Sequence, residues 1–153
     1  MIFKRISRAD PERVFIVVKN GYAAATLTNG QPVQWDMTAA DGVTVDISGA
    51  AFKRMAAFAG IIAESIAYGS YGLMQVYGYH GDVPVDCSTT GKNIHTGAPL
   101  FFSVNAFNLE GPYLSSGVGI EELYVEHRVA ACALEAHTKV GTTARIAVMI
   151  YAM

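Results

Sequence analysis

The sequence predicts a mainly β protein with a single domain, for three reasons. The chain has 153 residues, enough for one sizeable core, and 52% of them are hydrophobic while 16% are charged. Its 15 glycines place a turn signal every 7 to 12 residues along most of the chain, which is the spacing of short strands. Several segments between these turns alternate apolar and polar residues, as strands with one buried face do.

The first part of the chain supplies a strand and a hairpin. Residues 14–18 are a continuous run of β-branched and aromatic side chains, which favours a strand. Within 32–48, two alternating segments flank Asp41-Gly42, a dipeptide typical of tight turns, so we expect a hairpin. The apolar side chains that this hairpin should turn toward one buried face are Val33, Trp35, Met37, Val43, Val45 and Ile47.

The stretch 50–67 carries apolar residues at spacings of three and four, typical of a helix face, but Gly60 lies in its middle. We expect one short helix near 50–57, followed by a strand over 58–67. Glycines and polar residues between 79 and 83 predict a turn there. The remaining strands that we expect are 73–79, 83–87, 99–104, 124–136 and 143–151.

Two short segments, 67 residues apart, share the order Gly-x-Pro-aliphatic. They are Gly30-Gln31-Pro32-Val33 and Gly97-Ala98-Pro99-Leu100. In both, Gly supplies an unusual backbone angle and Pro opens a strand at a turn or an edge. The pattern hints at two related sheet halves, and a chance match of two short segments is the alternative.

Too few charged side chains are present to cover an isolated molecule. A compact monomer of this mass exposes roughly 7,500 Å², whereas the chain has 11 basic and 13 acidic residues. Small and apolar side chains must form the rest of the surface, and a large apolar share marks surface that meets another subunit. We therefore expect an oligomer or an assembly component. The formal net charge of −2 favours neither nucleic acid nor a membrane as a direct partner.

Charge is unevenly spread along the chain. The first 19 positions carry five basic residues against two acidic ones, and residues 110–126 carry four glutamates and no basic residue. We divide the chain into an N-terminal arm, residues 1–13, and a single β-rich domain, residues 14–153. A basic arm and an acidic loop can pair between subunits. The alternative is two solvated segments that never meet, because exposed pairs contribute little.

Candidate catalytic and ligand-binding motifs are all incomplete. Gly69-Ser70-Tyr71-Gly72 lacks the spacing of a nucleophile elbow. His80 and Asp82 can orient each other across Gly81, but nothing in the sequence supplies a third partner, so a polar turn is the favoured interpretation. Gly91-Lys92-Asn93 lacks the other residues of a phosphate loop. We expect no enzyme and no cofactor.

Metal and nucleic-acid sites are not predicted either. The pairs Cys87 with His95 and Cys132 with His137 lack zinc-site spacing. A cluster of acidic residues and a histidine lacks the regular pattern of a calcium loop, and four close tyrosines lack a basic groove, so we expect those tyrosines to pack between strands or at a subunit contact. The acidic cluster is Glu121, Glu122, Glu126 and His127, and the tyrosines are Tyr68, Tyr71, Tyr77 and Tyr79.

Compartment signals are also weak. The basic start of the chain is not followed by the apolar run of a secretory signal, so no export signal is expected. The longest uncharged stretches, 65–81 and 93–109, contain Gly, Asn, Gln or Pro and do not predict a bilayer span. Cys87 and Cys132 have no CxxC spacing, which favours free buried thiols in a reducing compartment.

Several motifs resemble those of the capsid decoration proteins of tailed bacteriophages. A small-residue strand that ends in Ala-Leu-Glu-Ala is followed by a turn and a closing Val/Ile strand. Repeated Gly-aliphatic turns and strands precede it, so that the resemblance covers residues 14–151. The motifs are VAACALEAH at 129–137, ARIAVMIY at 144–151, AGII at 59–62, YGLMQVYG at 71–78 and GAPL at 97–100.

The resemblance implies a β-barrel or β-tulip-like sandwich with an extended arm. It implies a homotrimer that binds the major capsid protein on the outside of the virion, bridges capsomers and has no catalytic residues. Such a protein is made in the host cytoplasm and is located on the capsid surface. The residues that we expect at interfaces are Ile2, Phe3, Lys4, Arg5, Arg8, Arg13, Tyr113, Glu121 and Glu122.

Two alternatives remain open from the sequence. One is another virion component, such as a tail or connector protein. The other is a small β-barrel ligand-binding protein with a pocket among Trp35, the tyrosines and His80.

Overall fold

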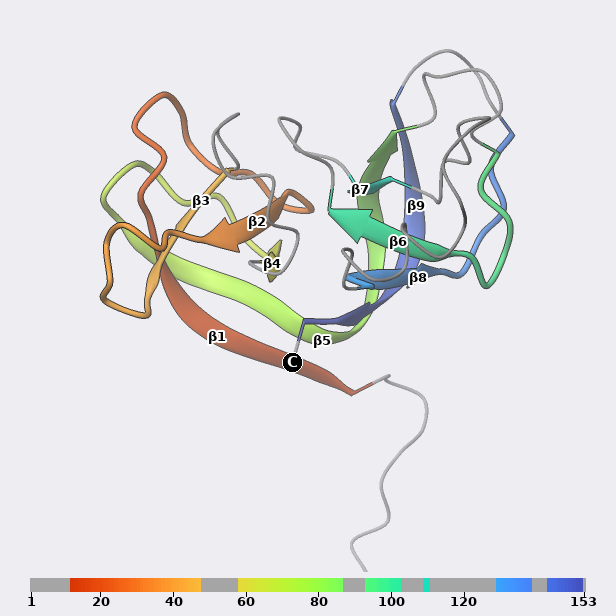
Figure 1. The fold of residues 1–153 in the computed structure, drawn as a ribbon, viewed down its shortest axis with the longest axis horizontal. Coiled ribbons are helices and arrows are strands. Elements are labelled where there is room, and N and C mark those ends of the chain that lie inside the picture. The colour runs from red at the N-terminus through yellow and green to blue at the C-terminus, as the bar shows by residue number, and fades with distance from the viewer. Residues whose placement is uncertain are drawn as a thin grey trace, which may run out of the picture.

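The computed structural model describes residues 12–47, 58–86, 93–102, 109–110, 129–138 and 143–152. These residues form strands and no helix (Figure 1), which confirms the predicted mainly β class; none of them therefore belongs to a helix able to cross a membrane. The strands are β1 Arg13–Asn20, β2 Pro32–Trp35, β3 Thr44–Asp46, β4 Phe58–Ile62, β5 Tyr71–Asp86, β6 Pro99–Phe102, β7 Leu109–Glu110, β8 Ala131–Ala133 and β9 Thr143–Tyr151.

All of these strands belong to one sheet, in which the pairings trace two cycles of five strands that share β5. The first cycle runs β1-β3-β2-β4-β5 and returns to β1, and the second runs β5-β7-β6-β8-β9 and returns to β5. Each cycle contains one parallel pair, β1 with β3 and β5 with β7. Figure 1 shows the two halves side by side, with the long β5 running from one into the other. We call residues 12–78 the first half and 79–152 the second half.

The two Gly-x-Pro segments occupy equivalent places in the two halves. Gly30 has a φ of 87° and Gly97 a φ of 84°, and the proline two residues later opens β2 in one half and β6 in the other. The amide of Gly30 donates to Ile62 at 2.8 Å, and the amide of Gly97 donates to Ala133 at 2.8 Å. The sequence repeat therefore corresponds to a repeat of the fold.

Further hydrogen bonds extend the equivalence beyond these turns. Three residues before each glycine, Leu27 and Ile94 form isolated bridges with Ile66 and His137, which lie four residues after the ends of β4 and β8. A glutamate then accepts the backbone amide of the last strand of each half. Glu64 accepts from Leu73 at 2.8 Å, and Glu135 accepts from Ala147 at 3.4 Å.

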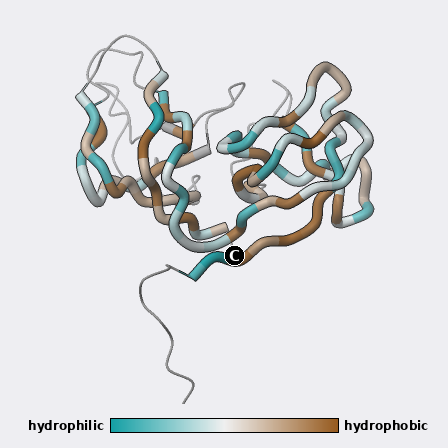
Figure 2. The backbone as a smooth tube through the Cα atoms, turned by 180° about the vertical axis from the view of Figure 1, so that it is seen from behind, coloured by the Kyte–Doolittle hydropathy of each residue, from teal (hydrophilic) through white to brown (hydrophobic). Residues whose placement is uncertain are grey.

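Each half has its own apolar core, and the two cores use matched positions. Figure 2 shows apolar stretches running through both halves. The second core also takes Phe58 and Ile61 from β4, which ties the halves together. The buried pairs, first half before second, are Val18 and Val83, Leu27 and Ile94, Val33 and Leu100, Val45 and Leu109, Ile62 and Ala133, Met74 and Val148, and Val76 and Ile150.

Strand β5 corrects one sequence-based prediction. We expected strands at 73–79 and 83–87 with a turn between them, but a single strand spans Tyr71–Asp86. Pairing with β9 continues past the glycines, with a register shift between His80 and Val83. The signals for a turn therefore mark a bulge, which bends a strand without ending it.

The predicted hairpin forms, since Gln34 pairs with Asp46 and Trp35 with Val45. Its predicted alternation is partly wrong, because Met37 is 64% exposed and Gln34 is buried. A register shift between Val33 and Gln34 changes the face to which the following side chains point.

Other boundaries differ as well. The strand predicted over 58–67 ends at Ile62, while the strand predicted over 143–151 has the observed bounds of β9. No separate strand was predicted at the position of β7. The expected helix near 50–57 lies outside the described residues, as do most of the N-terminal arm and the segment 124–128 of the strand predicted over 124–136.

Candidate functional site

The bulge in β5 places a polar cluster where the two halves meet. Between His80 and Val83 the pairing with β9 shifts, so that Gly81 and Asp82 have no partner residue in that ladder. The backbone amide of Asp82 donates to Nδ1 of His80 at 3.2 Å. A neutral imidazole that accepts at Nδ1 carries its proton on Nε2, so His80 presents a donor at its other nitrogen.

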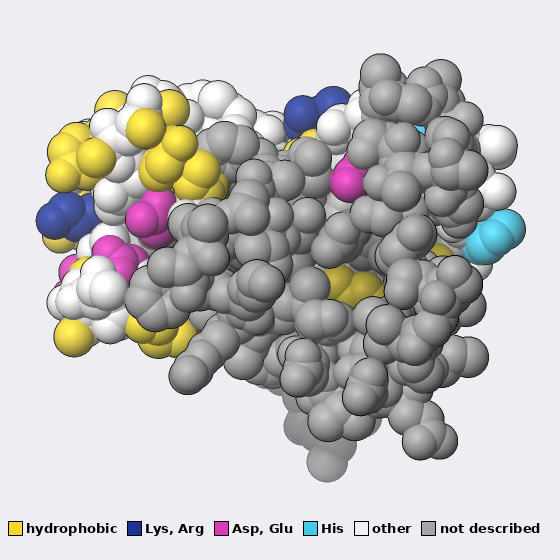
Figure 3. Space-filling model, turned by 45° about the horizontal axis from the view of Figure 1, so that its top comes forward, with side chains coloured by type: hydrophobic (Ala, Val, Ile, Leu, Met, Phe, Trp, Pro, Cys, Tyr) yellow, Lys and Arg dark blue, Asp and Glu magenta, His cyan; other side chains and the backbone are white. Residues whose placement is uncertain are grey.

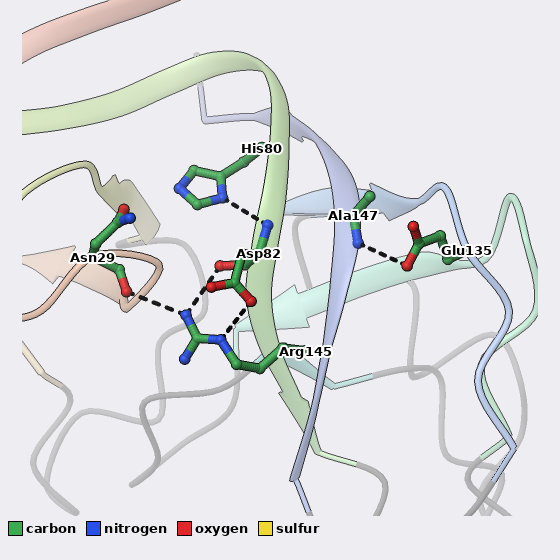
Figure 4. Close-up of polar contacts among 6 residues, drawn as sticks. All are labelled: Asn29, His80, Asp82, Glu135, Arg145 and Ala147. Carbon is green, nitrogen blue, oxygen red and sulfur yellow. Dashed lines mark hydrogen bonds and ion pairs between the residues drawn. The ribbon is translucent and has the colours of Figure 1, made fainter.

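Arg145 of β9 fastens this bulge to the first half (Figure 4). Its Nε donates to the Asp82 carboxylate at 2.6 Å, and its Nη2 donates to the backbone oxygens of Asp82 at 3.2 Å and Asn29 at 3.3 Å. Asn29 directly precedes Gly30, whose missing side chain lets the turn approach closely. A Cβ on Gly30 would lie 2.5 Å from the Asp82 carbonyl oxygen and 2.6 Å from Nη2 of Arg145.

A recess of about 300 Å³ opens beside the bulge. Figure 4 shows the imidazole of His80 and the side-chain amide of Asn29 facing the same space, away from the Arg145 contact. Residues of both halves line the recess: Arg13, Phe15, Asn29, Ala63, Gln75, His80, Gly81 and Asp82.

Gln75 is the buried polar group of this recess, with 2% of its surface exposed. Its Nε2 donates to the carbonyl oxygens of Tyr77 at 3.1 Å and Tyr79 at 3.0 Å. Two carbonyl acceptors fix the orientation of the amide, so Oε1 points away from them. No donor from the described residues reaches that oxygen. A buried acceptor without a partner costs about 1–3 kcal/mol, and because Gln75 lines the recess, a group bound there can supply the missing donor.

Electrostatics keep the cluster in a defined protonation state. Burial lowers the pKa of His80, with Arg13 and Arg145 acting in the same direction and Asp82 opposing them. The Arg145 hydrogen bond lowers the pKa of Asp82. Near neutral pH the imidazole is therefore neutral and the carboxylate is charged and paired.

The cluster offers hydrogen-bonding groups more readily than catalytic ones. The carboxylate of Asp82 is bound to Arg145, and the contact between Asp82 and the His80 imidazole is made by the backbone amide of Asp82. His80 and Asp82 therefore do not form the carboxylate–imidazole pair of a catalytic triad, which we considered from the sequence. Within the described part of the chain, no three His, Cys, Asp or Glu side chains come together as a metal site.

A second surface feature lies on the outer side of β1 and the beginning of β5. Val17 pairs directly with Leu73, and Phe15 and Tyr71 lie on the same face, where Tyr71 pairs with the partly exposed Lys19. These four side chains are exposed by 42% at Phe15, 59% at Val17, 64% at Tyr71 and 41% at Leu73. We call them the apolar face. Figure 3 looks onto another side, where hydrophobic side chains also gather at the surface of the first half.

Of the interface residues predicted from the sequence, the structure describes only Arg13, and it does not test the predicted role. Arg13 opens β1, lines the recess and holds its guanidinium 5.8 Å from the centre of the Tyr79 ring. Trp35, expected in a pocket, packs against the core of the first half. The residues that lie outside the described part of the chain are Ile2, Phe3, Lys4, Arg5, Arg8, Tyr113, Glu121 and Glu122.

Two polar residues of the recess and the arginine that holds the bulge had no functional prediction from the sequence. Asn29 adjoins the repeated Gly-x-Pro segment, so its place in a turn could have been noticed. Gln75 lies in an otherwise apolar run, and a polar residue there is a weak signal. Arg145 is 63 positions from Asp82, and nothing local indicates that contact.

Comparison with known proteins does not assign the chain to a family. No family model matches the chain, and no curated protein matches it. A solved structure, the N base of the head fiber protein gp8.5 of bacteriophage phi29, is similar over 92% of this chain and 96% of that chain, with a TM-score of 0.48 and 13% sequence identity. Because this TM-score is below 0.5, we base no argument on the likeness.

Proposed function

We propose that this chain is a structural protein of a phage head, which works by contact with other protein subunits and catalyses no reaction. The resemblance of residues 14–151 to capsid decoration proteins supports this function. The observation that carries it is the apolar face, since contiguous exposed apolar side chains on neighbouring strands mark surfaces that meet another protein.

Comparison of the two halves strengthens the argument from the apolar face. Val18 pairs with Gly72 as Val83 pairs with Ile146, so the neighbouring positions can be matched. The place of Val17 is then taken by Asp82, and the place of Tyr71 by Arg145. The same scaffold thus carries an ion pair on one half and apolar side chains on the other. The fold therefore does not require apolar side chains at Val17 and Tyr71, and contact with a partner surface explains why they are present.

In the finer form of the proposal the protein is a homotrimer on the capsid exterior of the virion. The apolar face of each subunit packs against a neighbouring copy, and the basic arm, residues 1–13, contacts the major capsid protein. Many copies then add interface area across capsomer seams and stabilise the shell by mass action. The recess beside His80 plays no part in this function.

The test is a substitution in the middle of the apolar face. Val17→Glu places a charge there, so the trimer is expected to dissociate into monomers, as measured by light scattering coupled to size exclusion. Met37→Glu, at a side chain that is 64% exposed elsewhere on the first half, is the control and should leave the trimer intact. A monomeric native protein, or a Val17→Glu variant that remains trimeric, would contradict the proposal.

The arm requires a separate experiment. Deletion of residues 2–12 should abolish sedimentation with purified capsids while the circular dichroism spectrum of the β domain remains. Capsid binding that survives this deletion would exclude the arm as the capsid contact.

A further inference from the structure

We propose that the recess at the junction of the two halves is a binding site for a single sugar residue. This site goes beyond the proposed function, although it shares Phe15 with the apolar face and Arg13 with the arm. Three features carry the inference: the open acceptor of Gln75, the donors opposite it, and the aromatic ring at the rim.

Gln75 decides what kind of group can enter. Only 2% of Gln75 is exposed, and its Oε1 accepts no hydrogen bond from the described residues. A ligand that fits must therefore bring a hydrogen-bond donor. A carboxylate has only acceptors to offer, so a carboxylate bound to Arg13 would leave the glutamine oxygen unsatisfied.

The other polar groups of the recess require an acceptor on the same ligand. His80 presents its Nε2 donor, because Nδ1 is occupied by the Asp82 amide. Arg13 contributes a guanidinium, and the amide of Asn29 can both donate and accept. A simple ammonium ion carries donors only, so it cannot accept hydrogen bonds from His80 and Arg13. Hydroxyl groups donate and accept at one atom, and several of them on one ring match this mixture.

Apolar contact and size complete the match to a sugar. Phe15 lines the recess and is 42% exposed, so one ring face is available for the C–H face of a sugar ring. The volume of about 300 Å³ lies at the small end of ligand sites. This volume is larger than a single amide group requires and is large enough for one monosaccharide unit.

Nuclear magnetic resonance titration of the full chain tests this site. The probes are the methyl glycosides of glucose, galactose, mannose and N-acetylglucosamine, with inorganic phosphate and acetamide as comparison probes. We expect at least one glycoside to shift the side-chain amide signals of Gln75 and the ring signals of His80, with a dissociation constant on the order of 1 mM, typical of a few hydrogen bonds and one apolar contact.

Variants separate the recess from the rest of the surface. Asn29→Ala and His80→Phe should each weaken glycoside binding about tenfold by removing one hydrogen-bonding group, which corresponds to about 1.4 kcal/mol. Thr96→Ala alters the residue that precedes Gly97, the matched position in the second half, and should bind like the unaltered protein. Both recess variants keep the backbone oxygen and the carboxylate that hold Arg145, so their fold should be retained.

Several outcomes would overturn the proposal. It fails if no glycoside shifts these signals, in which case water satisfies Gln75, or if only phosphate or only acetamide does. It also fails if both recess variants bind glycoside as well as the Thr96→Ala control. None of these results bears on the oligomeric state of the Val17→Glu variant, so the two proposals fail independently.

Discussion

The two halves of this molecule share a backbone scheme and differ in what their outer surfaces present. Matched turns, matched bridges and a matched glutamate–amide bond recur in both. On the outer side, Val17 and Tyr71 in the first half correspond to Asp82 and Arg145 in the second. Few positions therefore fix the architecture, and the outward side chains are free to acquire separate tasks. The first half presents the apolar face, and both halves supply polar side chains to the recess.

The largest expected effect concerns one core position at which the halves disagree. Ile66 is 1% exposed, while its counterpart His137 is partly exposed. Ile66→His removes a buried aliphatic side chain and buries an imidazole, which should reduce the free energy of unfolding by roughly 4 kcal/mol. The reciprocal change His137→Ile should alter it by less than about 1 kcal/mol. Chemical denaturation measures both, and equal effects would show that the two positions are not distinguished by burial.

The paired glycines give the next largest difference. Both adopt positive φ, so alanine at either costs about 1–2 kcal/mol through backbone strain. Only Gly30 also meets another part of the chain, because Asp82 and Arg145 lie against it, whereas a Cβ on Gly97 meets nothing within 4 Å. Gly30→Ala should therefore destabilise by roughly 3 kcal/mol, and Gly97→Ala by about half as much. Equal losses in denaturant titrations would mean that the junction adjusts without cost.

The matched residues Glu64 and Glu135 should differ less in their contributions to stability. Glu64 accepts the Leu73 amide at 2.8 Å, and Glu135 accepts the Ala147 amide at 3.4 Å. Glu64→Ala should cost about 1 kcal/mol of stability, and Glu135→Ala less, because the longer hydrogen bond is weaker. Thermal unfolding of both variants and of the double variant checks the order and whether the two effects add.

The smallest effect lies in the β2–β3 connection of the first half, whose counterpart lies outside the described residues. The Thr44 hydroxyl, followed by the amides of Val43 and Thr44, lowers the pKa of the Asp41 carboxyl to about 2. The lowered pKa stabilises the folded state above pH 3.8, and that contribution is lost as the pH falls from 3.8 toward 2. Carbon resonance titration should give a midpoint of about 2, and Thr44→Val should move it upward.

Asp36 serves as the internal control for this titration. Its own pKa is lowered chiefly by the Thr38 hydroxyl, so it should keep a depressed value in the Thr44→Val protein. An Asp41 midpoint that does not move would assign the shift to the backbone amides.

Local sequence patterns predicted the parts of the fold that local forces determine. The last strand, the hairpin and both Gly-x-Pro strand starts follow from alternation, turn residues and the fixed φ of proline. Strand β5 was misjudged because Gly78 and Gly81 resemble turn residues, whereas pairing with β9 keeps the strand continuous. The recess depends on Asn29 and Gln75, and on the bulge that Arg145 holds, which pairing brings together from distant positions. Only His80 and Asp82, two residues apart, had a sequence signal for proximity.

The sharing of β5 limits how this protein can come apart. Its early residues close the ring of the first half and its late residues close the ring of the second, so no cut within Tyr71–Asp86 leaves both fragments with a full set of strands. A protease that cut there, or a gene divided at that point, would yield two fragments, each without the complete β5 strand that its remaining strands pair with. The two halves should accordingly melt in one cooperative transition, although their backbones repeat.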